Sequence, residues 1–174
     1  TVLLITFFLT VIFDLTVAIE VGLVIACVLF MKRVMETTEI SVITDEIDPN
    51  KESDITVHEE NLMIPKGIEV YEINGPYFFG IATKFEETMT QLGDRPKVRI
   101  IRMRKVPFID STGIHNLTAL CEMSQKEKTT IILSGVNDNV HNVLEKAGFY
   151  ELLGKENICP NINVALERAK SLVE

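Results

Sequence analysis

The chain has 174 residues and a formal net charge of −8, with 25 acidic side chains against 17 basic ones, and 47% of its residues are apolar. The negative charge argues against nucleic-acid binding, which needs a surplus of Lys and Arg for phosphate contact. The apolar fraction argues against disorder along the whole chain, because it supplies ample material for a core.

The first 31 residues predict membrane-embedded helices. Thr1–Met31 contains no Lys or Arg, and 24 of its residues are apolar. A spanning helix needs roughly 20 mostly apolar residues, and Asp14 and Glu20 interrupt this run. We therefore expect the end of one membrane helix at Val2–Phe13, a tight turn near Asp14, and a second, short helix at about Leu15–Met31. One long helix is the alternative.

Charges near the apolar run predict its orientation and its surroundings. Lys32 and Arg33 follow it at once, which favours a cytoplasmic location for that end. A signal peptide would need a basic leading region and a small-residue cleavage site, and neither is present. Carboxylates that face lipid are costly. Asp14 and Glu20 are therefore expected to face further membrane helices, a turn or an aqueous cavity, in a protein of which this chain is a fragment.

The next region is strongly acidic. Val34–Asn61 holds nine acidic residues and one base, Lys51, so it accounts for a net charge of −8. Asp48-Pro49-Asn50-Lys51 is a turn signal. This composition predicts a solvated, self-repelling linker over residues 32–61. Binding of a basic partner by the same charges is the alternative.

The remaining residues, 62–174, predict an α/β domain. They carry 14 acidic and 14 basic side chains and are therefore neutral. Their order of β-rich runs and helical patterns, β–α–β–α–β–α–α, implies right-handed βαβ units and a mixed, largely parallel sheet. Strands are expected at Ile68–Ile73, Lys97–Val106 and Thr130–Val136, with an edge strand around Val57–Met63, and helices at about Ile81–Leu92, Gly113–Gln125, Val140–Ala147 and Ile162–Leu172.

The sharpest local feature is Asp110-Ser111-Thr112-Gly113, which lies between a predicted strand and a predicted helix. A helix N-terminus presents free backbone N–H groups and the positive end of the helix dipole. Asp110 or Ser111 could simply cap the helix. Alternatively, the loop could hold a hydroxyl whose phosphate those N–H groups would stabilise.

No other pattern predicts a catalytic or metal site. The spacing of Cys27, Cys121 and Cys159 fits neither a zinc site nor a redox pair. Ser111 and His115 are four residues apart, but a nucleophile and its base also need an orienting group and an oxyanion hole, and neither is signalled. Phosphate-binding glycine motifs are absent from the sequence. We expect no catalytic residue, no metal and no cofactor.

A dense basic stretch lies on and around the second predicted strand. It could face an anion, anionic lipid or the acidic linker. Its side chains could instead be strand-end charges paired with Asp or Glu, because the same strand also feeds the core. The stretch comprises Arg95, Lys97, Arg99, Arg102, Arg104 and Lys105.

Three segments resemble one known family. Residues 6–22 (TFFLTVIFDLTVAIEVG) resemble the last membrane segments of SulP anion transporters, the sulfate permease family. Residues 106–113 (VPFIDSTG) and 144–149 (LEKAGF) resemble the STAS domain that follows them, named for sulfate transporters and anti-sigma-factor antagonists. On this resemblance the chain is identified as a C-terminal SulP fragment with its STAS domain.

The resemblance implies a secondary transporter of inorganic or small organic anions, such as sulfate, bicarbonate or dicarboxylates. Its substrate site would lie in earlier membrane helices of a multi-pass protein of the cell (inner) membrane. The STAS domain would be a cytoplasmic module that regulates transport and binds an unidentified cytosolic protein, and the family favours a homodimer. It would not be an enzyme.

The resemblance also gives the Asp110–Gly113 loop a role. In soluble anti-sigma antagonists the Ser of the matching motif is a kinase target, which here is Ser111, with Thr112 beside it. The alternative function is therefore a phospho-switch that binds a kinase or an anti-sigma factor.

Overall fold

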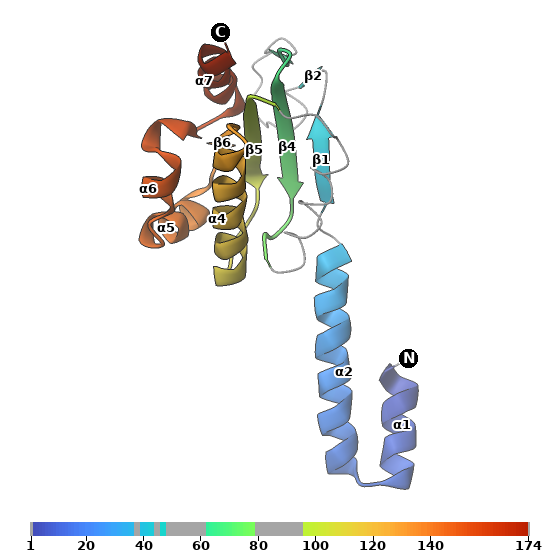
Figure 1. Cartoon of the computed structure of the whole chain (residues 1–174). Helices are drawn as coiled ribbons and strands as arrows, with labels where there is room; N and C mark the ends of the chain where they lie inside the picture. The colour runs from blue at the N-terminus through green and yellow to red at the C-terminus, as the bar shows by residue number, and fades with distance from the viewer. Residues whose placement is uncertain (1, 37–38, 44–45, 48–61, 79–95, 174) are drawn as a thin grey trace. The chain divides into compact units, whose positions relative to one another are not determined.

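The structure, a computed structural model, describes residues 2–36, 39–43, 46–47, 62–78 and 96–173. The chain divides into two compact units, residues 1–37 and residues 38–174. The first unit is a pair of helices and the second is an α/β domain (Figure 1).

The first unit is a helical hairpin. A short turn at Asp14 separates α1 (Val2–Ile12) from α2 (Leu15–Glu36), so the prediction of two helices is confirmed and the single long helix is wrong. α2 continues past its predicted end at Met31, and its 22 residues span about 33 Å at 1.5 Å each. Among the described residues, the segment Leu15–Arg33 is long and apolar enough to cross a membrane.

Small residues let the two helices approach closely. Ala18 on α2 is 1% exposed. A Cβ at Gly22, one turn further along, would collide with the side chain of Thr6 on α1. Small residues four apart are a common means of helix contact in a bilayer, where packing replaces the hydrophobic driving force. The Thr10 hydroxyl donates to the Thr6 carbonyl at 2.7 Å, so α1 satisfies it internally.

The second unit is built on a five-stranded sheet with the order β1-β4-β5-β6-β7. β1 pairs with β4 antiparallel, and the three other pairings are parallel. The predicted class, α/β with a mixed and largely parallel sheet, is therefore confirmed. The strands are β1 (Glu39–Ile43), β4 (Ile68–Asn74), β5 (Val98–Lys105), β6 (Thr130–Ser134) and β7 (Ile158–Cys159); β2 (Glu46–Ile47) and β3 (Leu62–Met63) form a separate antiparallel pair.

The prediction of a linker over residues 32–61 is wrong for its first part. Residues 32–36 belong to α2, and Glu39–Ile43 is the edge strand β1. The alternation within β1 explains this: Ile40 and Val42 pack against the core on one face of the sheet, and Ile43 packs against the core on the other face. Residues 48–61 lie outside the described part of the chain.

Helices cover both faces of the sheet. In β5, Ile101 and Met103 point to one core, and Val98 and Ile100 point to the other. Two-sided burial is typical of strands in parallel sheets. The first core is completed by α4 (Ser111–Lys126), α5 (Asp138–Lys146) and α6 (Phe149–Leu153), and the second by α7 (Ile162–Val173).

Most predicted elements agree with the structure to within a few residues. Besides β1 and β2, three short elements were not predicted: α6, the 3-10 helix η1 (Lys155–Asn157) and β7. The predicted helix at Ile81–Leu92, and all of the predicted strand Val57–Met63 except β3, lie outside the described residues.

Candidate functional site

The loop around Ser111 lies at the carboxyl edge of the parallel strands. β4 and β5 run parallel, so both end at this edge. Beyond β4, Tyr77 forms an isolated parallel bridge with Ile109, and its backbone N–H donates to the Phe108 carbonyl at 3.1 Å. The carboxyl edge is where α/β folds generally hold their functional loops.

Asp110 is the cap of α4. Its carboxylate Oδ1 accepts the backbone N–H of Gly113 at 2.6 Å, and its backbone is extended, as a cap requires. Its carbonyl accepts the N–H of Ile114 at 3.0 Å, the first bond of the helix. Of the two capping residues that the sequence allowed, the structure selects Asp110.

Because Asp110 caps α4, the side chains of Ser111 and Thr112 do not serve as its cap. They occupy the first two positions of α4, and both are exposed. A hydroxyl there can be reached by another protein, and a phosphate on it would meet the positive end of the helix dipole.

Gly113 is fixed by a close approach between two chain segments. A Cβ on Gly113 would lie 2.5 Å from the carbonyl oxygen of Tyr77 and 2.8 Å from Cγ1 of Ile109. Only a residue without a side chain allows this contact. The start of α4, and with it Ser111, is thus held at a defined distance from the end of β4.

A second capped helix reinforces this edge. Asn137 caps α5 by accepting the N–H of Val140 at 3.0 Å, and its amide nitrogen donates to the carbonyl of Val106. The Asn137 side chain thus links the loop after β6 to the loop after β5 by a hydrogen bond.

An aromatic pair borders the same loop. The rings of Phe78 and Phe108 stack with centroids 6.4 Å apart and planes 9° from parallel. Phe108 is 52% exposed although it is large and apolar. The edge thus presents an apolar side chain three residues before Ser111.

The basic stretch on β5 is mostly internal. The register sets Arg99 opposite Glu69 and Arg102 opposite Glu72. Arg99 Nε lies 3.4 Å from Glu69 Oε2, and Arg102 lies 3.1 Å from Glu72 Oε1. Both arginines are less than a tenth exposed, so they form buried cross-strand ion pairs.

For Arg99 and Arg102 the prediction of charges paired with Asp or Glu is therefore confirmed, and the alternative of a surface that faces an anion is wrong. Lys105 adds a longer contact to Glu72, at 3.9 Å. Lys97 instead donates to the carbonyl of Val173 at 2.8 Å. Arg104 is exposed, and Arg95 lies outside the described residues.

The two acids of the apolar segment belong to the other unit. Asp14 precedes α2, and its carboxylate accepts the N–H of Leu15 at 2.6 Å. Glu20 is exposed on α2.

The cysteines of the domain are inert thiols. Cys121 and Cys159 are buried and free. Burial raises the pKa of Cys121 from 9.0 to about 12 and also raises the pKa of Cys159. Both therefore remain protonated and weakly nucleophilic at neutral pH.

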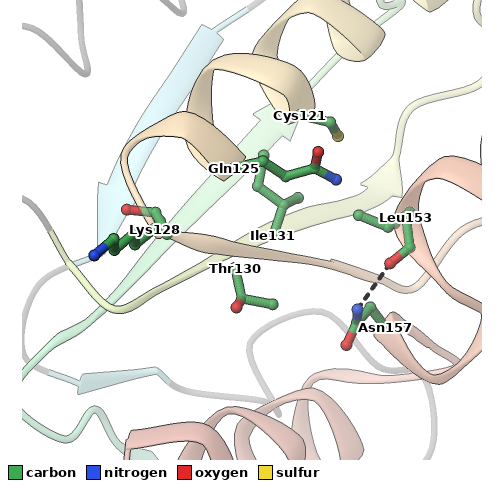
Figure 2. Close-up of a pocket in the computed structure, with 8 residues that line it drawn as sticks. Cys121, Gln125, Lys128, Thr130, Ile131, Leu153 and Asn157 are labelled. Atoms are coloured by element: carbon green, nitrogen blue, oxygen red, sulfur yellow. Dashed lines mark hydrogen bonds between the residues drawn. The ribbon is translucent and has the colours of Figure 1, made fainter.

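The domain has a pocket of about 290 Å³ that no sequence pattern predicted (Figure 2). It lies at the amino end of β6, away from Ser111, between the end of α4 and the segment α6–η1. It could not be predicted, because α6 and η1 were not predicted. Its lining includes Cys121, Gln125, Lys128, Ile131, Leu153 and Asn157.

The fold and the capped carboxyl-edge loop define a class of domain. The STAS domain family matches residues 61–165. The chain therefore belongs to the STAS domain family.

Its relatives identify the SulP group within that family. The crystal structure of a sulfate transporter family protein from Wolinella succinogenes is 45% identical, with a TM-score of 0.61, over 64% of this chain and 92% of that one. YvdB of Bacillus subtilis, named for sulfate transport, is 28% identical over 153 residues, which are 87% of this chain and 27% of that protein. The chain spans about a quarter of the length of the curated relatives it matches.

Two more distant structures share the fold alone. The murine Slc26a9 anion transporter in its inward-facing state has a TM-score of 0.71 at 19% identity, over 98% of this chain and 28% of that one. An anti-sigma factor antagonist from Thermotoga maritima has a TM-score of 0.53 at 15% identity, over 64% of this chain and 92% of that one.

Proposed function

We propose that the chain is part of a secondary anion transporter of the SulP type, for sulfate, bicarbonate or a dicarboxylate. Residues 1–31 are the end of its membrane part. The STAS domain, residues 62–174 with β1 as an added edge strand, is a cytoplasmic module that regulates transport by binding a cytosolic protein.

This proposal rests on the presence of a transporter-type STAS domain and an apolar helical hairpin in the same chain. The domain is 45% identical to that of a sulfate transporter family protein. It follows a helical hairpin whose second helix could cross a membrane. Lys32 and Arg33, near the end of that helix, favour a cytoplasmic location for the domain.

A regulatory role agrees better than catalysis with the site around Ser111. His115, the nearest base in sequence, is exposed, and among the described residues no hydrogen bond joins it to Ser111. An exposed hydroxyl at a capped helix start is instead suited to phosphorylation, because the added charge meets the helix dipole without displacing a buried contact.

A phospho-switch that binds a kinase or an anti-sigma factor is the second candidate. The shared fold with an anti-sigma factor antagonist and the exposed Ser111 favour it. The apolar hairpin argues against it, because a soluble switch has no use for a helix of this length and apolarity.

Uptake measurements test the transporter proposal. Cells that express the full protein containing this chain should accumulate labelled sulfate, bicarbonate or succinate above cells with an empty vector. Membrane fractionation separates the two candidates. Recovery of the protein in the membrane, resistant to carbonate extraction, supports the transporter. A freely soluble protein that binds a kinase supports the switch and contradicts the transporter.

A further inference from the structure

Lys128, at the rim of the pocket at the amino end of β6, is an unusual residue for its backbone position. Its N–H donates to the Gln125 carbonyl at 3.1 Å and the Thr129 N–H donates to the Ser124 carbonyl at 2.8 Å, so helix termination sets its left-handed conformation. Lys128 has a φ of 62°. Among the described residues it is the one non-glycine residue with positive φ. The position follows the C-cap of α4, where glycine is the usual choice because it adopts the left-handed conformation without strain.

Interaction with the helix dipole does not explain why a lysine occupies position 128. Lys126, in the last turn of α4, already supplies a positive charge there with ordinary helical geometry. Lys128 is exposed and lines the pocket. Glycine would terminate α4 here without strain, so the presence of a lysine at the rim of a pocket is the starting point for a functional hypothesis.

Polar groups at the other end of the pocket are held in fixed positions. Figure 2 shows Lys128 at one end and Asn157 at the other. Asn157 is 7% exposed; its amide nitrogen donates to the Leu153 carbonyl at 2.8 Å, and its oxygen accepts from Arg168 Nε at 3.3 Å. The amide nitrogen keeps a second N–H, which these bonds do not use.

The middle of the pocket is apolar or neutral. Ile131 and Leu153 contribute aliphatic surface, and both are buried. Cys121 adds a thiol that burial keeps protonated, with a pKa of about 12. The amide nitrogen of Gln125 donates to the Leu152 carbonyl at 3.4 Å. A ligand would thus meet one cation at the rim, a short apolar wall and an amide beyond it.

The C-terminal end of α4 favours a singly charged ligand over a doubly charged one at Lys128. A helix C-terminus carries a partial negative charge, which disfavours a doubly charged phosphate. Phosphate sites are instead typical of helix N-termini and arginine pairs. A carboxylate carries one charge, and a single ammonium group can neutralise it.

From these features we infer that the pocket binds a small carboxylate with a short apolar body, whose charged end pairs with Lys128 and whose body lies on Ile131 and Leu153. The domain would thus have a small-molecule binding site at the edge of the sheet opposite Ser111. The inference does not depend on the transporter proposal, because it uses only contacts within the domain.

Site-resolved NMR on the full chain in detergent tests the inference. The probes are butanoate, butanamide as its uncharged isostere, and inorganic phosphate, with methyl-labelled Ile and Thr as reporters. Butanoate should shift the resonances of Ile131 and Thr130 saturably, and the other two should not. Absence of a saturable shift with butanoate, or equal shifts with butanamide or phosphate, overturns the inference.

Substitutions distinguish a binding role of Lys128 from a structural one. Lys128→Gly removes the ammonium and relieves the backbone strain, so it should weaken butanoate binding about tenfold or more while raising the melting temperature. Lys126→Ala, the matched control, should leave binding unchanged. If Lys128→Gly binds butanoate as well as the unsubstituted chain, the assigned site is wrong.

Discussion

Substitution of Gly113 by alanine tests the packing that holds the Ser111 loop. Gly113 is the third residue of α4. An added Cβ would lie 2.5 Å from the Tyr77 carbonyl oxygen, 2.8 Å from Cγ1 of Ile109 and 3.0 Å from Cδ1 of Tyr77. The first of these atoms belongs to the backbone and cannot rotate away.

Two opposing effects set the size of the change. Alanine is favoured over glycine within a helix by about 1 kcal/mol. Overpacking a well-filled site costs about 1–3 kcal/mol. Because the nearest contact is a backbone oxygen bridged to the neighbouring loop, we expect the cost near its upper limit and a net loss of about 1–2 kcal/mol.

Urea denaturation followed by tyrosine fluorescence measures this loss. The chain has no Trp, and its three Tyr all lie in the domain, so the signal reports the domain even when the whole chain is in detergent. Thr112→Ala, an exposed neighbour, should change the free energy of unfolding by about 0.5 kcal/mol or less. If Gly113→Ala is as stable as the unsubstituted chain, α4 does not pack on Tyr77 as described.

Three further predictions use urea denaturation, and the last of them is followed by circular dichroism because free tyrosine ionises at about pH 10. Asp110→Ala should cost about 1 kcal/mol through loss of the cap, whereas Asp110→Asn should retain most of it; equal losses would contradict the capping role. Arg102→Met should lower the free energy of unfolding by about 3 kcal/mol, because among the described residues it leaves the buried Glu72 carboxylate with the longer contact to Lys105 alone. Adding Glu72→Gln should recover part of that loss. If Arg102→Met leaves the stability unchanged, the ion pair is not buried. Because burial raises the pKa of Cys121 from 9.0 to about 12, its contribution to stability is complete below pH 9 and is lost as the pH rises toward 12. Cys121→Ala should therefore show a shallower decline over that range, and an unchanged slope would count against burial of the thiol.

Hydrophobic periodicity predicted much of the domain. Leu117, Leu120 and Cys121 recur at helical spacing and lie in one core, as expected for α4. The Asp110–Gly113 loop was also found, because a cap residue followed by a helical pattern is a local signal. Local signals of this kind do not depend on distant partners.

Composition misled the assignment of the linker. The acidic average over residues 34–61 obscures Ile40, Val42 and Ile43, which alternate across the two faces of β1. A strand needs only about five residues of alternation, and its partner, β4, lies some 30 residues further along the chain. The pairing, rather than the average charge, decides the structure of this segment.

The buried ion pairs and the pocket depend on contacts that no local pattern encodes. Glu69 and Arg99 are 30 positions apart and meet only through the register of β4 and β5. The pocket needs the short helix α6, and five residues are too few for a recognisable helical period. Both features follow from tertiary packing.

We propose that the domain regulates an anion transporter through the loop at Ser111. The most direct measurement takes the labelled anion that the full protein accumulates, among sulfate, bicarbonate and succinate, and compares its uptake with that of the Ser111→Glu and Ser111→Ala variants at equal membrane abundance. We expect measurable uptake by the unsubstituted protein. We also expect a change of about fivefold or more in the uptake by Ser111→Glu, with an unaltered urea transition. Identical uptake by all three proteins, or a change that follows from unfolding of the domain, would contradict it.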